Sequence, residues 1–244
     1  MITAILTFHN EGAIAIPSIR SADLCRAYCE TDGIRVELLA VLDRADQETT
    51  EIVEELSSDF RMRVLRTDIG DCGGARNEGV RNASEKYCAF LDGDDLWGHK
   101  WLRHAWITAE ADGDDAIYHP EVCLYFGVQE HIFSHVDPSD SDFDPRAFAV
   151  HNYWTALTFS SSSLLRTHPI EVAFHREGFA YEDWHWHQKT LSAGIAHKNV
   201  PGTVHFIRQR KSGSILNAAR NQPLITKQVP DFQRILFQNR LPIS

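Results

Sequence analysis

The sequence is short of positive charge. Its 244 residues include 24 Lys and Arg against 34 Asp and Glu, which gives a formal net charge of −10 at pH 7. Phosphate backbones and anionic lipid head groups repel a chain of this charge. The balance argues against nucleic acid as a main partner. An anionic ligand would instead need a divalent cation, or a local group of arginine side chains and backbone donors.

Long apolar runs and cysteine pairs are also missing. No apolar run approaches the roughly 18 to 20 residues that span a bilayer, and no basic leader follows Met1. The five cysteines include no CxxC pair of the kind that binds zinc or cycles between thiol and disulfide. We therefore expect a cytoplasmic protein with reduced, buried thiols and no transmembrane segment.

What the sequence does contain is an alternation of apolar, strand-like runs with helical segments. Hydrophobic residues make up 43% of the chain, enough for a sizeable core. Strands are predicted at 2–8, 34–42, 61–66 and 87–91, with helices at 13–29, 48–56 and 73–83. Such alternation predicts parallel strands joined by right-handed crossovers, with the carboxyl ends of the strands at one edge of the sheet. Ligands of such sheets bind along that edge.

The pattern is looser beyond residue 97. We expect a loop at 137–145, a strand pair or bend at 153–165, helices at 100–110 and 184–193, and strands at 116–126, 128–136 and 203–207. The predicted organisation is one domain over residues 1–215. It comprises a nucleotide-binding half, 1–97, and an acceptor or catalytic half, 98–215. Residues 216–244 would form a C-terminal tail that packs on this domain.

One acidic motif stands directly after a predicted strand. Residues 92–95 read Asp-Gly-Asp-Asp, and carboxylates so placed can reach one hard cation such as Mg²⁺ or Mn²⁺. A surface turn favours the same residue types and is the alternative. Residues 112–115 have the same letters but follow a polar helix end, so we expect only a turn there.

Four segments together resemble glycosyltransferase family 2. They read Leu-Thr-Phe-His-Asn-Glu at 6–11, Val-Leu-Asp at 41–43, Gly-Gly-Ala-Arg-Asn-Glu-Gly at 73–79 and Phe-Leu-Asp-Gly-Asp-Asp-Leu-Trp at 90–97. Weaker matches follow at 181–184, 206–208 and 212–214. The resemblance implies a GT-A fold, a mostly parallel sheet with helices on both faces. It also implies inverting transfer of a sugar from a nucleotide donor to a hydroxyl group.

The resemblance further implies a nucleotide site. Its residues would be Thr7, Phe8, His9, Glu11, Asp43, Arg76, Asp92 and Gly93. A ring such as Phe8 can lie against a base, and a carboxylate such as Asp43 can accept from an imide N–H or a hydroxyl. The alternatives are a helix N-cap for Asp43 and a solvent ion pair for Arg76.

By the same resemblance, Asp92 contacts the ribose and Asp94 binds Mn²⁺ or Mg²⁺. Asp92 and His205 are the further candidate metal ligands, and Asp95 would orient its neighbours. The metal would stabilise charge on the leaving nucleotide. Arg208 and Arg210, with Lys211, form a compact basic cluster that could clamp the diphosphate or could be a solvated turn.

Asp183 is the candidate general base, with Glu182 as the second choice. An inverting transfer needs one carboxylate to take the proton of the acceptor hydroxyl. Trp184 and nearby aromatics could stack on a sugar and raise the pKa of the base by partial desolvation. The two acids could also simply open a helix, and both roles are compatible. We do not expect zinc at His185 and His187, which do not share a helix face.

The donor and the acceptor are only partly defined by the sequence. A UDP-sugar is the favoured donor, and the acceptor could be a polysaccharide, a lipid-linked intermediate or a small metabolite. A homodimer is compatible with the sequence but not indicated by it. The rival functions are a nucleotidyltransferase and a non-catalytic sugar-nucleotide or glycan-binding module. Residues 9–12 lack the basic phosphate loop of the first, and the presence of both Asp94 and Asp183 argues against the second.

Overall fold

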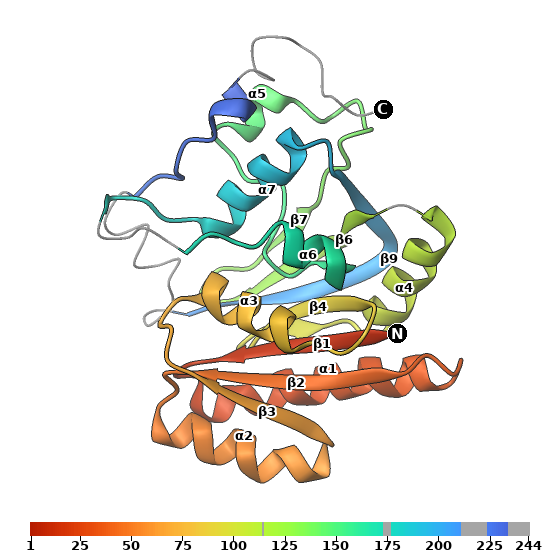
Figure 1. The fold of residues 1–244 in the computed structure, drawn as a ribbon, viewed down its shortest axis with the longest axis vertical. Coiled ribbons are helices and arrows are strands. Elements are labelled where there is room, and N and C mark those ends of the chain that lie inside the picture. Colours follow the sequence, from red (N-terminus) through yellow and green to blue (C-terminus); the bar gives the residue numbers. More distant parts are fainter. Residues whose placement is uncertain (114, 173–176, 211–223, 234–244) are drawn as a thin grey trace.

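The computed structural model describes residues 1–113, 115–172, 177–210 and 224–233. In this part of the chain a nine-stranded sheet runs in the order β3-β2-β1-β4-β8-β6-β9-β5, with β7 paired to β6 (Figure 1). The predicted alternation is confirmed for the first half. Its elements are β1 (Ile2–Phe8), η1 (Gly12–Ile14), α1 (Ala15–Glu30), β2 (Val36–Asp43), α2 (Gln47–Asp59), β3 (Met62–Thr67), α3 (Cys72–Asn82) and β4 (Tyr87–Asp92). These four strands are mutually parallel.

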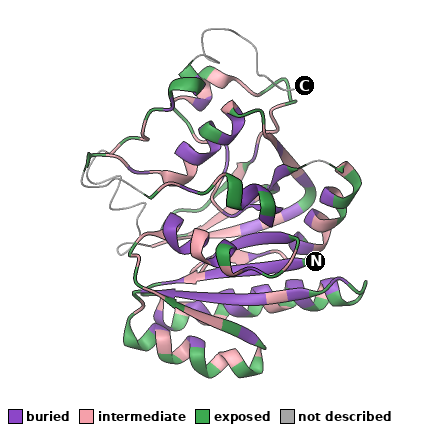
Figure 2. Ribbon diagram, in the orientation of Figure 1, coloured by how far each residue is buried: buried purple, intermediate pink, exposed green. Residues whose placement is uncertain are grey.

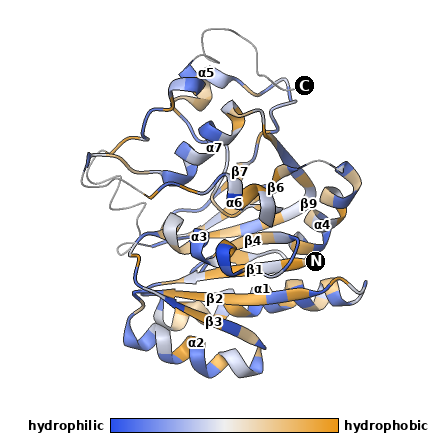
Figure 3. Ribbon diagram, in the orientation of Figure 1, coloured by the Kyte–Doolittle hydropathy of each residue, from blue (hydrophilic) through white to orange (hydrophobic). Residues whose placement is uncertain are grey.

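Helices cover both faces of the sheet because successive strand residues point to opposite sides. On β1, Leu6 and Phe8 pack in the core formed with α1, α2 and α4 (Trp101–Asp112). Ile5 packs in the core beneath α3, α6 (Ser162–Thr167) and α7 (Glu182–Ser192). Strands β1, β2 and β4 are accordingly apolar and buried over most of their length (Figures 2 and 3).

The second half of the sheet is mixed rather than mostly parallel. The short strand β8 (Phe159–Ser161) is antiparallel to β4 and to β6 (Ala116–Gly127). β9 (Ala196–Gln209) runs parallel to β6 along nearly its whole length, so the predicted strand at 203–207 is much longer than expected. Antiparallel partners complete this half, namely β5 (Leu96–Trp97) on β9 and β7 (His131–Ser134) on β6.

The predicted strand pair at 153–165 is instead a short strand followed by helix α6 (Ser162–Thr167). Ser161 caps this helix, because its side chain accepts from the backbone N–H of Leu164 at 3.1 Å. The look-alike motif at 112–115 ends a helix, as expected. Gly113 has φ 68° at the C-cap of α4, a conformation that glycine adopts without strain, while Asp114 lies outside the described residues.

A third apolar cluster joins the C-terminal elements. Phe148 of α5 (Pro145–Phe148) and Trp154 pack with Leu191 of α7 (Glu182–Ser192). Val229 and Phe232 are buried in the same cluster, so the described residues 224–233 lie against the domain. The remainder of the predicted tail, including residues 216–223 and 234–244, lies outside the described residues.

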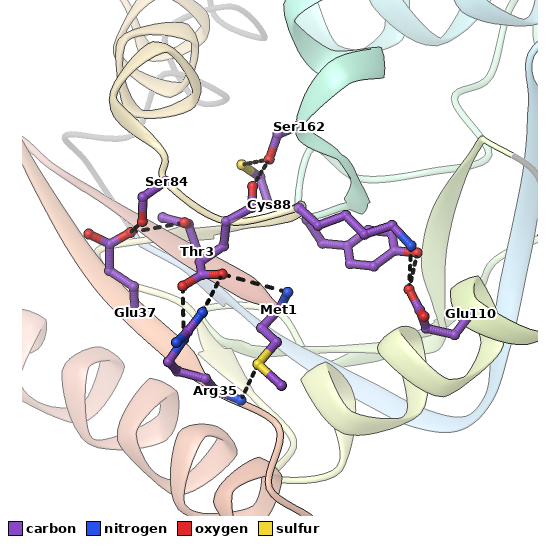
Figure 4. A network of polar contacts seen from close by, with 11 residues as sticks. Met1, Thr3, Arg35, Glu37, Ser84, Cys88, Glu110 and Ser162 are labelled. Atoms are coloured by element: carbon purple, nitrogen blue, oxygen red, sulfur yellow. Dashed lines mark hydrogen bonds and ion pairs between the residues drawn. The ribbon is translucent and has the colours of Figure 1, made fainter.

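A polar network closes the amino ends of the parallel strands (Figure 4). Glu37 accepts hydrogen bonds from Thr3 and Ser84, both at 3.0 Å. Glu85 pairs with Arg35 at 3.1 Å and with the terminal amino group of Met1 at 3.6 Å. This edge is thus occupied by internal contacts, and the polar motifs lie at the opposite edge. Within the described ranges no helix is both long and apolar enough to cross a bilayer.

Histidines form an unusual layer between β6, β9 and α7. His119 and His197 stack at 5.2 Å between ring centroids, and Nε2 of the first lies 2.9 Å from Nδ1 of the second. His135 and His187 are also buried, and Trp154 stacks on His119 at 5.0 Å. Burial lowers the pKa of these rings, to about 4 for His135 and about 3 for His197. The layer is therefore neutral at pH 7.

This layer predicts a loss of stability in acid. His135 binds a proton below about pH 6.5 in the unfolded chain but only below about 4 in the folded protein. The unfolded state therefore binds more protons between these values, and lowering the pH from about 7.5 to about 5 should cost about 2 kcal/mol through this residue.

Urea denaturation of the wild type and of His135→Asn at both pH values tests this expectation. The asparagine amide can still donate to the Pro120 carbonyl, which His135 contacts through Nδ1 at 2.8 Å. The variant should lose about 2 kcal/mol less than the wild type over the interval. Equal losses in the two proteins would contradict the assignment.

Candidate active site

Three polar segments meet at the carboxyl edge of the parallel strands. The register pairs Thr7 of β1 with Asp92 of β4, and Thr7 Oγ1 donates to Asp92 Oδ1 at 3.2 Å. On the other side of β1, His9 Nδ1 lies 2.8 Å from the carbonyl oxygen of Asp43. The periodicity of the sequence predicts this meeting, and the structure confirms it for these residues.

Arg76 of α3 joins the two halves of the site. Its side chain is 3% exposed, and Nη2 donates to both carboxylate oxygens of Asp92, at 2.6 and 2.9 Å. Its Nη1 lies 3.4 Å from Glu182 Oε1 at the start of α7. Burial alone would lower the pKa of Arg76, but Asp92 and the other acidic groups raise it above its usual value. The alternative of a solvent ion pair is therefore wrong.

The start of α3 explains how Arg76 reaches this position. Asp71 caps the helix by accepting from the N–H of Gly74 at 2.7 Å. A Cβ on Gly73 would lie 2.7 Å from Ile170 Cγ2, and one on Gly74 would lie 2.6 Å from Ile69 Cγ2. The paired glycines thus let the first turn of the helix pack closely against its neighbours.

The acidic loop after β4 is tied to the end of β9. Arg208 donates through its backbone N–H to Asp95 Oδ1 at 2.7 Å and through Nε to the carbonyl oxygen of Asp94 at 2.9 Å. Arg210 Nη2 pairs with Asp94 Oδ2 at 2.7 Å. The structure therefore brings both candidate phosphate-binding arginines to the acidic motif. Lys211 lies outside the described residues.

Carboxylates from the loops after β1 and β4 crowd this part of the site. Burial raises the pKa of Glu11, Asp94 and Asp95, and repulsion between the neighbouring acids adds to the shift. Arg210 acts in the opposite direction on Asp94 and Glu11. Carboxylate oxygens are the ligands that a hard divalent cation takes, and a cation would compensate this repulsion, but no three of the described side chains are arranged to hold one.

Gly93 allows the acidic loop to lie against β1. Its N–H donates to the Thr7 carbonyl oxygen at 2.9 Å, and its own carbonyl oxygen accepts from Ser18 Oγ at 2.9 Å. A Cβ at this position would approach Phe8 Cδ1 to 2.5 Å. Gly93 therefore has a packing role that any larger residue would disturb.

Phe8 and Asp43 differ from their expected roles. Phe8 is 1% exposed and packs in the core, which contradicts the expectation that its ring lies against a base. The Asp43 carboxylate accepts from Thr67 Oγ1 and from the backbone N–H groups of residues 69–71, at 2.7 to 3.1 Å. Its oxygens thus hold the loop before α3 and are not open to a nucleotide. The alternative of a helix N-cap is also wrong, because Asp46 caps α2.

His205 lies in the core. Its ring is fully buried and meets the ring of Trp101 edge-on, with 4.6 Å between centroids. Neither ring nitrogen has a hydrogen-bond partner among the described residues. Within the same residues, no group of three or more His, Cys, Asp or Glu side chains is arranged to hold a metal. His205 therefore does not join Asp92 and Asp94 in one metal-binding group.

Glu182 and Asp183 occupy the first turn of α7, the position that the helix-opening alternative also predicts. Tyr181 before them has φ 62°, which is uncommon for a residue with a side chain. Burial, reinforced by Glu182, raises the pKa of Asp183 to about 7. Trp184 donates from its indole to the Phe148 carbonyl oxygen at 2.9 Å, so its ring fixes α5 against α7.

Two contacts at this site involve residues that the sequence patterns do not single out. Cys72 Sγ donates to Glu182 Oε1 at 2.7 Å, and Asn152 Nδ2 donates to Asp183 Oδ2 at 3.3 Å. Cys72 is the first residue of α3 and stands directly before the Gly-Gly pair. This position is the one sequence feature that could have indicated its place at the site. Asn152 follows a loosely patterned stretch and carries no such signal.

The buried pairing of Arg76 makes a prediction about stability. Lysine keeps the positive charge but lacks the planar fork that reaches both Asp92 oxygens and Glu182, so Arg76→Lys should lower the free energy of unfolding by on the order of 2 to 4 kcal/mol. The matched control is Arg81→Lys on the same helix, whose exposed side chain pairs only with Glu78 among the described residues. We expect a loss under about 0.5 kcal/mol there. Urea denaturation that gives equal losses for both variants would contradict this account.

Comparisons with known proteins agree with the fold. The chain is 32% identical over 66 residues to an uncharacterized glycosyltransferase of Rickettsia bellii, a match that covers 27% of this chain and 10% of that protein. S. aureus TarS 1–349 in complex with UDP-GlcNAc aligns with a TM-score of 0.68 and 17% identity, over 89% of this chain and 61% of that one. The mannosyltransferase PcManGT from Pyrobaculum calidifontis, in complex with GDP-Man and Mn²⁺, gives 0.61 and 17%, over 97% and 68%.

These likenesses show the GT-A fold, and the family itself is shown by the sequence. Residues 3–158, more than half of the chain, match the profile of glycosyl transferase family 2. The chain therefore belongs to glycosyl transferase family 2.

Proposed function

We propose that the chain transfers a sugar from a nucleotide-sugar donor, with UDP-sugars favoured, to an acceptor hydroxyl at the carboxyl edge of β1 and β4. The observation that carries this proposal is the buried Arg76, which holds Asp92 of the acidic loop and Glu182 of α7 together. The donor side and the candidate base are thereby part of one rigid arrangement. UDP-GlcNAc and GDP-Man bound to the two structural relatives support a nucleotide-sugar donor.

On the donor side, Asp94 would hold Mn²⁺ or Mg²⁺, with Asp92 as the second acidic group. When bound there, a divalent cation supplies Lewis-acid stabilisation of the charge on the leaving nucleoside diphosphate. The crowding of Asp94 with Glu11 and Asp95 supports this assignment, since burial and mutual repulsion raise the pKa of all three carboxyl groups even though Arg210 pairs with Asp94. Mn²⁺ accompanies the donor in PcManGT.

The two arginines at the end of β9 would act differently. Arg208 is fixed by its bonds to the acidic loop and by the Phe126 ring, which lies 4.6 Å from its guanidinium. Arg210 reaches Asp94 through the end of its side chain, at 2.7 Å. A diphosphate at Asp94 would offer this guanidinium a second set of oxygen atoms. Arg210 is therefore the candidate clamp and Arg208 its support.

On the acceptor side, Asp183 is a better base than Glu182. Glu182 Oε1 already accepts from Cys72 and lies near Arg76, whereas Asp183 is half-buried with a pKa of about 7. In the proposed step the acceptor oxygen bonds to the anomeric carbon while the bond to the diphosphate oxygen breaks. Asp183 takes the hydroxyl proton. Attack from the face opposite the nucleotide inverts the configuration.

The metal assignment predicts a specific loss of donor binding. Asp94→Ala should remove the Mn²⁺-dependent part of the thermal shift caused by UDP, because Asp94 is the residue that would hold the cation. Asp115→Ala is the control, since this exposed acid belongs to the look-alike motif at the end of α4. It should leave the shift unchanged. A Mn²⁺-dependent shift that persists in Asp94→Ala would show that the metal binds elsewhere.

The base assignment predicts loss of turnover without loss of donor binding. Asp183→Asn should lower kcat about 10²- to 10⁴-fold and leave the Kd for the nucleotide within about twofold. In the wild type, turnover should fall below about pH 7, because protonated Asp183 cannot accept the hydroxyl proton. Nucleotide release and equilibrium binding measure the two quantities. Turnover near the wild-type level in Asp183→Asn would contradict the assignment, and donor binding without any nucleotide release would favour a binding module.

A further inference from the structure

Asn152 contacts the candidate base from a different part of the chain. It lies between α5 and β8, whereas Asp183 opens α7. Asn152 Nδ2 donates to Asp183 Oδ2 at 3.3 Å, and the backbone N–H of Trp184 donates to Asp183 Oδ1 at 2.8 Å. Each carboxylate oxygen thus accepts one hydrogen bond, and each keeps a further lone pair. Two donors from different directions fix the plane of the carboxylate.

The orientation of the Asn152 amide follows from its other contacts. Asn152 Oδ1 accepts from the backbone N–H of Trp154 at 3.3 Å, and His187 Nδ1 lies 3.5 Å from the same oxygen. Because a backbone N–H can only donate, the amide oxygen must face Trp154. The amide nitrogen is thereby left to face Asp183.

The partners of Asn152 are themselves rigid. Trp154 is 2% exposed, stacks on His119 and donates from its indole to the Val136 carbonyl oxygen at 2.9 Å. His187 is fully buried in the histidine layer, one turn after Asp183 on α7. Asn152 therefore connects the candidate base to the packed interior of the second half of the sheet.

We propose that Asn152 is a positioning residue for Asp183, which holds the carboxylate in one rotamer and stabilises its ionised form through a hydrogen bond. In this arrangement a remaining lone pair of Asp183 can face the acceptor hydroxyl. The inference rests on the proposed function only in taking Asp183 as the base.

The charged groups around Asp183 set the direction of the expected effect. Glu182 on the same helix and Asp92 of β4 raise the pKa of Asp183, whereas Arg76 of α3 lowers it. Burial keeps His187 neutral, so it adds no charge. A donor to the carboxylate favours the ionised form. Removal of the Asn152 amide should therefore raise the pKa of Asp183 further.

A direct titration of Asp183 tests this inference without any assay of turnover. In full-length protein labelled with ¹³C at the aspartate carboxyl groups, the resonance that disappears in Asp183→Asn identifies Asp183. Its midpoint should move from near pH 7 in the wild type to a value higher by about half a unit or more in Asn152→Leu. Asn152→Ala should show the same change and guards against a folding defect in the first variant.

Tyr153→Phe is the matched control. This substitution removes the hydroxyl group that accepts from the Asp144 N–H at 3.4 Å in the same segment. It removes no contact to Asp183 among the described residues. The titration midpoint of Asp183 in Tyr153→Phe should equal that in the wild type. Midpoints unchanged within about 0.2 units in both Asn152 variants would overturn the inference. Turnover retained by Asp183→Asn would instead overturn the base assignment, so the two failures are distinguishable.

Discussion

The arrangement depends on one buried guanidinium. Arg76 has lost nearly all contact with water, and a charge in that position is tolerated only because Asp92 and Glu182 meet it. Asp92 ends β4 and Glu182 begins α7, which are 90 residues apart in the chain. The same interaction that compensates the arginine therefore fixes the distance between the proposed donor side and the proposed base. A helix start built from Asp71 and two glycines places Arg76 at that point.

The acidic groups elsewhere in the site repel one another, in contrast to the compensated charges around Arg76. Burial and mutual repulsion raise the pKa of Glu11 in the loop after β1 and of Asp94 and Asp95 in the loop after β4, and the pKa of Asp183 is raised as well. Stability alone would not select such a cluster, since groups that repel one another in a buried place weaken the folded state. The cation and diphosphate proposed for this site would complete its charge balance.

Sequence patterns predict the first half of the molecule well, because parallel strands buried on both faces read as apolar runs that end at polar motifs. Thr7, His9, Asp92 and the arginines near Asp94 are brought together as expected. The pattern predicts less in the second half, where β6 and β9 are long, pair in a mixed sheet and include polar residues such as His119 and His197.

Sequence patterns also do not report the direction in which a side chain points. The family resemblance places Phe8 and Asp43 at the nucleotide, yet one ring is in the core and one carboxylate binds its own loop. Asn152 approaches Asp183 only through tertiary contacts that no local spacing reports.

The most direct test of this account is a crystal structure of the chain with UDP and Mn²⁺, in which anomalous scattering locates the metal. We predict a strong peak within coordination distance of the Asp94 carboxylate, with the Arg210 guanidinium on phosphate oxygens and Arg76 still between Asp92 and Glu182. A nucleotide bound away from the carboxyl edge of β1 and β4, or a metal that leaves Asp94 without a ligand, would contradict the account.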